Sequence, residues 1–140
     1  MILLDTDHLS IVINKQASGY AALAKRMQES PDQHFATTVV CVEEECRGWL
    51  AQINRLRDVR QQVSAYERLA KLFVFFRSWE IVLFNPRAAE EFTRLRKQRI
   101  RIGTQDLKIA CIALAHDALL LSANLRDFQQ VPDLRVESWL

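Results

Sequence analysis

Cysteine is scarce in this sequence, and the three cysteines present form no metal-binding or disulfide pattern. Cys41, Cys46 and Cys111 make no Cys-x-x-Cys pair and no cluster with histidine. An odd number of cysteines outside such patterns is typical of buried, reduced thiols. Zinc-finger and disulfide-framework proteins are therefore excluded, and with no secretory signal pattern we expect a cytoplasmic protein.

Long hydrophobic runs are also missing. The apolar start of the chain is interrupted by Asp5, Asp7 and His8, which excludes a signal-peptide core and a membrane span. No repeat, low-complexity stretch or linker divides the 140 residues, and the composition, 49% hydrophobic and 26% charged, is ordinary for a globular chain. We expect a single domain over residues 1–140.

The chain has no strong excess of charge of one sign. Its 19 basic and 17 acidic residues give a net charge of +2, which by itself indicates no polyanionic partner. The distribution is more informative, because the segment RLRKQRIR contains Arg94, Arg96, Lys97, Arg99 and Arg101. Such a basic segment is suited to contact RNA phosphates, although a solvated helix face has the same composition.

Short apolar runs predict a parallel sheet. The expected strands are residues 2–4, 35–39, 79–84, 119–122 and 135–139. Runs without polar alternation are typical of strands that are covered on both faces. Because helical patterns lie between them, we expect an open α/β sheet whose functional groups gather at the carboxyl ends of the strands.

Caps and periodicity locate the helices. The expected helices are residues 21–29, a helix that begins at Asn85-Pro86, residues 105–117, and the stretch 40–77 as two helices or one bent helix. Asn85 caps its helix, which turns Ala89, Phe92 and Leu95 inward. Thr104 is expected to cap the helix that follows it.

Two carboxylates directly follow the first predicted strand. An ionised carboxylate at a buried strand end needs a cation, hydrogen-bond donors or a metal ion. Asp7 is equally well explained as the N-cap of a helix over residues 9–14. The position of Asp5 favours a metal-binding role.

Further oxygen-bearing side chains follow other strands. The three glutamates of residues 43–45 fan about 100° apart at the start of a helix, so at most one or two can face a given site. Asp106 lies in the first turn of a later helix, and Asn124 and Asp127 follow the fourth strand. Helix dipoles and turn chemistry explain each one separately. Their shared position after strands predicts a common site.

These motifs resemble those of PIN-domain ribonucleases, and among them the VapC-type toxins of bacterial type II toxin–antitoxin systems. The resemblance is carried by LLDTD, TTVVCVEEECRG, RIGTQDLKIACIALAHDALLLSANLRDF and VPDLRVESW. Residues 102–139 are the most specific, whereas residues 50–101 match only in helical character. The resemblance implies a PIN-like three-layer α/β/α domain with a central, mainly parallel five-stranded sheet.

The resemblance also implies roles for individual residues. The implied metal ligands are Asp5, Glu44, Asp106 and Asn124, and the implied catalytic set is Asp5, Glu44, Asp106 and Asp127. Gly48, four residues after Glu44, selects that glutamate over Glu43 and Glu45, which are assigned to the solvent face. Thr6 and Asp7 are expected to support Asp5, whereas His8, His34 and His116 have no assigned role. Asn124 departs from the family, which more often has an acid there.

The implied chemistry is hydrolysis of RNA phosphodiester bonds by water, with Mg²⁺ as cofactor and Mn²⁺ as a substitute. Mg²⁺ prefers oxygen ligands, keeps several waters, and can activate one of them. The resemblance further implies a small antitoxin protein as partner and a homodimer. We expect the apolar helical region Trp49–Phe76 to supply an interface.

Two other classes fit parts of the sequence. A catalytically degenerate PIN-fold module that binds RNA or protein is consistent with Asn124. A haloacid-dehalogenase-type phosphatase is suggested by LDTD, which resembles the Asp-x-Asp motif of those enzymes. That class also needs a catalytic lysine and a later acidic pair, yet Lys108 is misplaced and no Gly-Asp-x-x-x-Asp follows.

Overall fold

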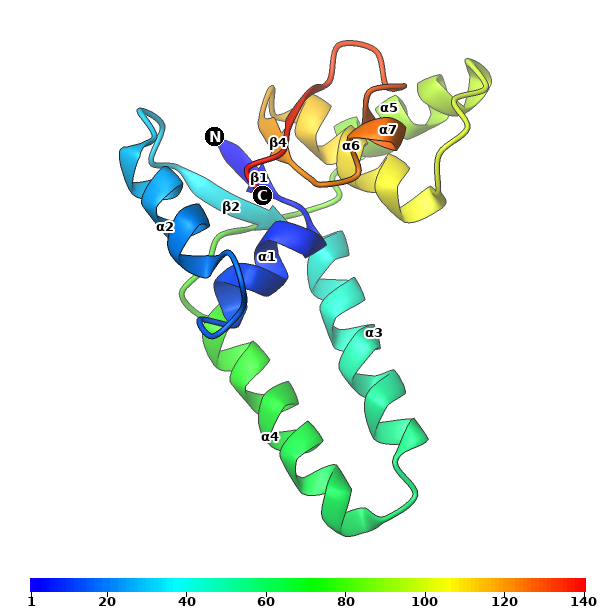
Figure 1. The fold of residues 1–140 in the computed structure, drawn as a ribbon. Coiled ribbons are helices and arrows are strands. Elements are labelled where there is room, and N and C mark those ends of the chain that lie inside the picture. The colour runs from blue at the N-terminus through cyan, green and yellow to red at the C-terminus, as the bar shows by residue number, and fades with distance from the viewer.

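The computed structural model describes all 140 residues as five strands and seven helices (Figure 1). In chain order these are β1 Ile2–Leu4, α1 Thr6–Ile13, α2 Tyr20–Glu29, β2 Phe35–Thr38, α3 Val39–Arg55, α4 Val59–Phe76, β3 Ile81–Val82, α5 Pro86–Lys97, α6 Thr104–Ala115, β4 Leu119–Leu121, α7 Leu125–Phe128 and β5 Arg135–Glu137. The expected alternation of strands and helices is confirmed.

The sheet is parallel throughout and has the order β3-β2-β1-β4-β5. The chain moves from β1 toward β3 and then crosses back to β4 and β5. Right-handed crossovers therefore place α1–α4 on one face and α5–α7 on the other, as Figure 1 shows. The expected three-layer α/β/α architecture is confirmed, and the order reverses between β1 and β4, where ligands bind in such sheets.

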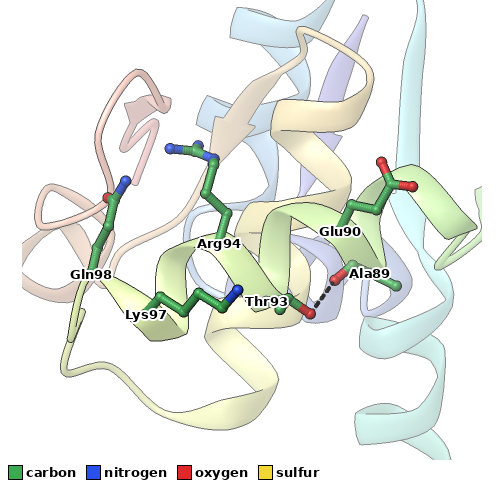
Figure 2. A pocket seen from close by; sticks show the side chains of 6 residues that line it. All are labelled: Ala89, Glu90, Thr93, Arg94, Lys97 and Gln98. Atoms are coloured by element: carbon green, nitrogen blue, oxygen red, sulfur yellow. Dashed lines mark hydrogen bonds between the residues drawn. The ribbon is translucent and has the colours of Figure 1, made fainter.

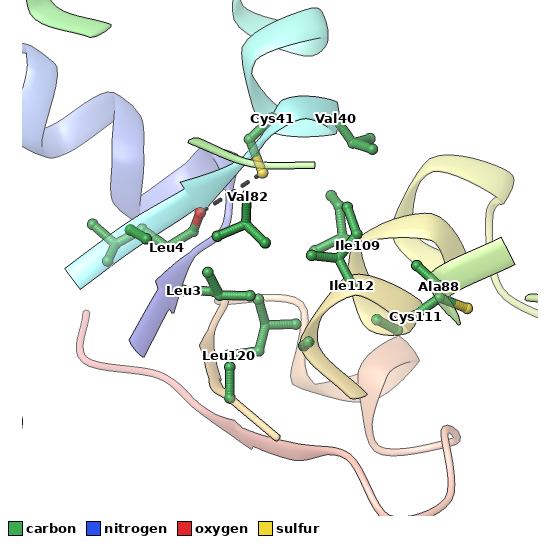
Figure 3. Close-up of a cluster of buried hydrophobic side chains, with 14 of the residues drawn as sticks. Leu3, Leu4, Val40, Cys41, Val82, Ala88, Ile109, Cys111, Ile112 and Leu120 are labelled. Atoms are coloured by element: carbon green, nitrogen blue, oxygen red, sulfur yellow. Dashed lines mark hydrogen bonds between the residues drawn. The ribbon is translucent and has the colours of Figure 1, made fainter. Parts of the chain in front are cut away.

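The main core lies between the sheet and α6 (Figure 3). Leu3 and Leu120 on the central strands and Ile109 and Ile112 on α6 are completely buried. Helix α6 packs against the sheet on one side and against α5 on another. Most of its circumference is therefore buried, which agrees with its apolar sequence. This packing fixes the start of α6 relative to the strand ends.

Helices α3 and α4 form a hairpin that extends away from the sheet (Figure 1). The break in the stretch 40–77, which the sequence left unplaced, follows Arg55, and Asp58 caps α4 by accepting a hydrogen bond from the backbone N–H of Arg60 at 2.9 Å. None of the seven helices combines the length and apolar character needed to cross a membrane.

Three local expectations about helix starts and strand length were wrong. Asp5 rather than Asp7 caps α1. Thr104 is the first residue of α6, and Gly103 is its N-cap. The third strand is only Ile81–Val82, and Trp79, expected to begin it, instead stacks on Phe75 of α4, with ring centroids 5.2 Å apart.

One expectation about the buried face of α5 was also wrong. Ala89 is exposed, whereas Ala88 is completely buried. Ala88, Phe92 and Leu95 follow the spacing i, i+4, i+7, which keeps all three on one stripe of the helix. Ala89 is rotated by about 100° from that stripe and faces solvent.

Candidate metal centre

Carboxylates and amides from four elements meet at the carboxyl edge of the sheet. Asp5 directly follows β1, Glu44 lies on the second turn of α3, Asp106 lies on the first turn of α6, and Asn124 follows β4. The strands are parallel and in register, so β1 and β4 deliver their following residues to the same edge. The sequence predicted this convergence, and the fold explains it.

Asp5 is a buried carboxylate, with 6% of its surface exposed. One oxygen, Oδ1, accepts a hydrogen bond from the backbone N–H of Thr6 at 2.8 Å and lies 3.8 Å from the Cys41 thiol. The other oxygen, Oδ2, accepts from the hydroxyl of Ser122 at 2.7 Å. These donors fix the orientation of the carboxylate. The contacts of Cys41 and Ser122 with Asp5 were not expected from the sequence.

The surroundings of Asp5 disfavour its charged form. The pKa of Asp5 is raised from 3.8 to about 6: burial is the largest cause, the bonds from Ser122 and Thr6 oppose it, and the negative charges of Asp7 and Asp106 add to it. No lysine or arginine forms an ion pair with it. A bound cation would remove both penalties.

Glu44 is the glutamate of residues 43–45 that turns toward Asp5. Its Oε2 accepts a hydrogen bond from the hydroxyl of Thr6, the residue next to Asp5. Glu43 is exposed and pairs with Arg47 and Gln105, as expected for the solvent face. Glu45 departs from that expectation, because it is half-buried and accepts from the Ser10 hydroxyl.

Asn124 connects the two remaining acids of the cluster. Its amide nitrogen donates to Oδ2 of Asp106 at 3.0 Å and to Oδ2 of Asp127 at 3.1 Å. Burial raises the pKa of Asp106, and the charges of Glu44 and Asp127 add to this, while the bond from Asn124 lowers it. Asp106 and Asp127 thus face the same space as Glu44, with one amide between them.

Asp7 supports the site from the side. Its Oδ2 accepts from the backbone N–H of Ala123 at 2.8 Å, and the hydroxyl of Ser122 lies 3.4 Å away. Burial raises the pKa of Asp7, but hydrogen bonds from His8 and the Ala123 N–H outweigh it and hold that pKa below its usual value. His8, read from the sequence as incidental, is completely buried.

The donor chemistry of this cluster fits a hard divalent cation. Asp5, Glu44, Asp106 and Asp127 bring oxygen ligands, and none of them takes part in an ion pair. As the side chains lie, no three of them converge to the spacing of a metal site. Mutual repulsion and the bonds from Thr6 and Asn124 keep the carboxylates apart, so binding requires small side-chain rotations.

A groove lies beside the cluster, and a basic segment precedes α6. The groove, about 430 Å³, opens at Thr6 and Glu44 and continues between α3 and α4 past Trp49 and Arg68. The basic residues of the segment 94–101 lie on the end of α5 and in the loop before α6. Figure 2 shows Arg94 and Lys97 on the exposed surface of α5.

Arg96 links this basic segment to the acidic cluster. Its guanidinium donates to the hydroxyl of Thr104 at 2.8 Å, two residues before Asp106, and lies over the ring of Phe92. Arg94 pairs with Glu91 on the same helix, and Arg99 and Arg101 are exposed in the loop. Arg94 and Lys97 line one surface hollow on α5, whereas Arg96, Arg99 and Arg101 line another in the loop before α6, so the sequence-predicted basic residues are divided between two surfaces.

Curated proteins with similar sequences are ribonucleases by name. Ribonuclease VapC1 of Haemophilus influenzae (strain R2866) is 28% identical over 139 residues, which cover 98% of this chain and 96% of that protein. Ribonuclease VapC2 of Rickettsia felis is 34% identical over 74 residues, which cover 50% of this chain and 55% of that protein. No protein-family model matches the chain.

Solved structures match over the whole chain. VapBC2 from Rickettsia felis, bound to a DNA fragment from its promoter, contains a chain that is 25% identical with a TM-score of 0.72 and full coverage of both chains. VapBC-1 from nontypeable Haemophilus influenzae gives a TM-score of 0.76 at 21% identity, covering 99% of this chain and 98% of that one, and shows the shared fold.

Proposed function

Because the chain belongs to the VapC-type PIN-domain family, we propose that it is a metal-dependent endoribonuclease and the toxin of a toxin–antitoxin pair. The observation that carries this proposal is the cluster of Asp5, Glu44, Asp106 and Asp127, whose charges no basic side chain balances. Relatives of nearly full length are ribonucleases by name. Retaining such a cluster costs stability unless a cation compensates it.

In the proposed site, Asp5, Glu44 and Asp106 hold Mg²⁺, with Mn²⁺ as a substitute, and the side-chain oxygen of Asn124 completes the ligand set. A bound divalent cation supplies the positive charge that polarises a phosphodiester and lowers the pKa of a water molecule. The second cation that some nucleases use is not needed for this assignment.

The remaining residues orient these ligands. The Thr6 hydroxyl donates to Glu44, and the Ser122 hydroxyl donates to Asp5, so each carboxylate has a defined orientation from which it rotates toward the cation. Asn124 holds Asp106 and Asp127 at a fixed separation. In this proposal Asp127 accepts a hydrogen bond from the attacking water and orients it.

RNA is proposed to reach this site along the basic segment 94–101. Arg94, Arg96, Lys97, Arg99 and Arg101 are proposed to contact phosphates, which carry most of the affinity of nonspecific RNA binding. Arg96 donates to the hydroxyl of Thr104, so the basic segment contacts the first turn of α6, which carries Asp106.

The two alternatives, an enzyme of another class and a catalytically degenerate binding module, have less support. A phosphatase of the haloacid-dehalogenase type needs a lysine at its nucleophilic aspartate, whereas Lys108 contacts Gln105 at 3.3 Å and no lysine pairs with Asp5. A degenerate binding module would not need to retain the four carboxylates that have no basic partner.

We propose a small antitoxin protein as the regulatory partner and a homodimer as the assembly. Structures of relatives contain VapBC pairs. The exposed apolar residues of α4 are available for self-association. The three cysteines are free thiols, in agreement with a reducing compartment such as the cytoplasm.

Adjacent glutamates on α3 provide a matched test of the nuclease. Glu44→Gln removes one proposed ligand, and Glu43→Gln removes a neighbouring surface carboxylate of the same size. We expect Glu44→Gln, like Asp5→Asn, to lower RNA cleavage at least about a hundredfold, since removing a group that acts in the transition state has effects of this order. Glu43→Gln is expected to cleave at the wild-type rate.

The assay uses a pool of structured and single-stranded RNA with Mg²⁺, with Mn²⁺ and with EDTA. Cleavage that requires metal and is lost in Glu44→Gln supports the proposal. No cleavage by folded wild-type protein in either metal would favour the binding module, and equal activity of the two glutamine variants would refute the ligand assignment.

A further inference from the structure

His8 is a buried histidine with a partner on each ring nitrogen. It lies on α1, has no exposed surface, and is three residues from Asp5. Its Nε2 lies 3.0 Å from the backbone nitrogen of Trp139, and its Nδ1 contacts Oδ1 of Asp7. Because each ring nitrogen has its own partner, the hydrogen-bond network decides which nitrogen donates and which accepts.

The partner at Nε2 determines where the proton of the ring lies. A backbone N–H can only donate a hydrogen bond, so Nε2 must accept and therefore carries no proton. In the neutral ring the proton is then on Nδ1, which donates to Oδ1 of Asp7. The opposite tautomer would leave the Trp139 N–H without an acceptor and turn a lone pair toward a carboxylate.

Two bonds from His8 hold Oδ1 of Asp7, one from the ring Nδ1 and one from the backbone N–H at 2.6 Å. With Oδ1 held by His8, Oδ2 is turned toward the β4–α7 loop, where the Ala123 N–H donates to it at 2.8 Å. Ser122 in that loop donates to Asp5, and its hydroxyl oxygen accepts from the backbone N–H of Asn124 at 3.0 Å. Asp7 therefore connects α1 to the loop that carries Asn124.

The other end of this chain of bonds is anchored by Trp139. Its ring packs edge-on against Phe35, with centroids 6.2 Å apart, and the guanidinium of Arg26 lies 4.8 Å above it. Its indole N–H donates to Glu137 at 2.9 Å. These contacts hold the backbone of Trp139 in place, so its N–H is a fixed donor rather than a mobile one.

We propose that His8 is a positioning residue of the metal centre. The Trp139 N–H sets the tautomer in which Nδ1 is a donor, and through the Nδ1 bond His8 orients Asp7 toward the loop of residues 122–124. The inference rests on the proposed function, because the quantity that His8 improves is the affinity of the carboxylate cluster for a divalent cation. Groups that orient metal ligands typically contribute 10- to 100-fold in affinity.

Two substitutions separate the two bonds of His8. His8→Asn places an amide nitrogen near the position of Nδ1, so it can still donate to Asp7, but it reaches no further. His8→Gln places an amide oxygen near the position of Nε2, so it can still accept from Trp139, but it loses the short contact with Asp7. Both variants replace the imidazole ring with an uncharged amide side chain.

The measurement is Mn²⁺ binding by titration calorimetry on the full chain without RNA, together with the melting temperature in EDTA. We expect His8→Asn to bind Mn²⁺ within about threefold of wild type, and His8→Gln to bind about tenfold or more weakly. A purely structural role would instead lower both affinities in proportion to the loss of melting temperature, and that outcome would overturn the proposal.

Nitrogen-15 NMR of the wild-type histidine provides an independent test that needs no variant. We expect a protonated Nδ1 and an unprotonated Nε2 for His8, and the reverse pattern would overturn the inference. Absence of Mn²⁺ binding by wild-type protein would refute the metal site itself. Equal Mn²⁺ affinity of wild type and His8→Gln would refute only the role of His8, so the two failures are distinguishable.

Discussion

At the scale of a single residue, Asp5 shows a conflict between stability and the proposed chemistry. Its carboxylate is buried beside two other acids, and its pKa is raised to about 6. The folded state therefore binds the proton more tightly than the unfolded state does. In metal-free protein, the stability that depends on Asp5 is present below about pH 4 and is lost as the pH rises toward 6.

We predict that Asp5→Asn stabilises the metal-free protein above pH 6, by an amount on the order of 2 kcal/mol. Asparagine keeps the N-cap of α1 and can still accept from Ser122, but it carries no charge. Urea unfolding in EDTA at pH 4 and at pH 7.5 measures the effect. The difference between variant and wild type should shrink at pH 4, and a variant that is less stable at both pH values would contradict the prediction.

At the scale of an element, the hairpin of α3 and α4 depends on local signals more than the rest of the molecule does. It extends away from the sheet, so its far end has few tertiary contacts to define where each helix begins. The carboxylate of Asp58 determines where α4 begins, because it caps the first turn of that helix. Capping matters most where packing contributes least.

We predict that Asp58→Ala lowers the free energy of unfolding by about 1 kcal/mol, the usual cost of removing an N-cap. Glu67→Ala, on the exposed surface of the same helix, is the control and should change stability by less than about 0.5 kcal/mol. Chemical denaturation of the three proteins measures both values. Equal stability of the two variants would mean that packing alone defines the start of α4.

At the scale of the whole molecule, one apolar stripe remains uncovered. Val59, Val63, Tyr66 and Phe73 follow helical spacing along α4, and each has more than half of its surface exposed. The opposite stripe of the same helix, with Ala65, Leu72 and Phe76, is buried. Contiguous exposed apolar surface of this kind is typical of an interface between proteins.

We predict that the protein is a dimer at micromolar concentration and that Val63→Glu combined with Phe73→Glu makes it a monomer. Leu83→Glu, at a separate exposed apolar residue, is the matched control and should leave the dimer intact. Light scattering distinguishes these states. A monomeric wild-type protein would show that this stripe does not mediate self-association.

Sequence reasoning located the strands and the acidic positions, because both depend on short-range patterns. Each predicted strand overlaps an observed one, and Glu44, the glutamate that the prediction selects, contacts Thr6 beside Asp5, whereas Glu43 pairs with Arg47. Helix starts were less predictable. Asp5 and Asp7 are equally good caps by residue type, and only the position of β1 decides between them.

The sequence by itself determined the parallel α/β fold and the clustering of acids at one edge, because apolar periodicity and the placement of acids after strands are local features. The tertiary structure decided which groups hold those acids. Ser122, Asn124 and Trp139 contact residues more than a dozen positions away, and such contacts leave no periodic trace in the chain. The role of His8 is decided in the same way, since its tautomer is set by a backbone N–H 131 residues later.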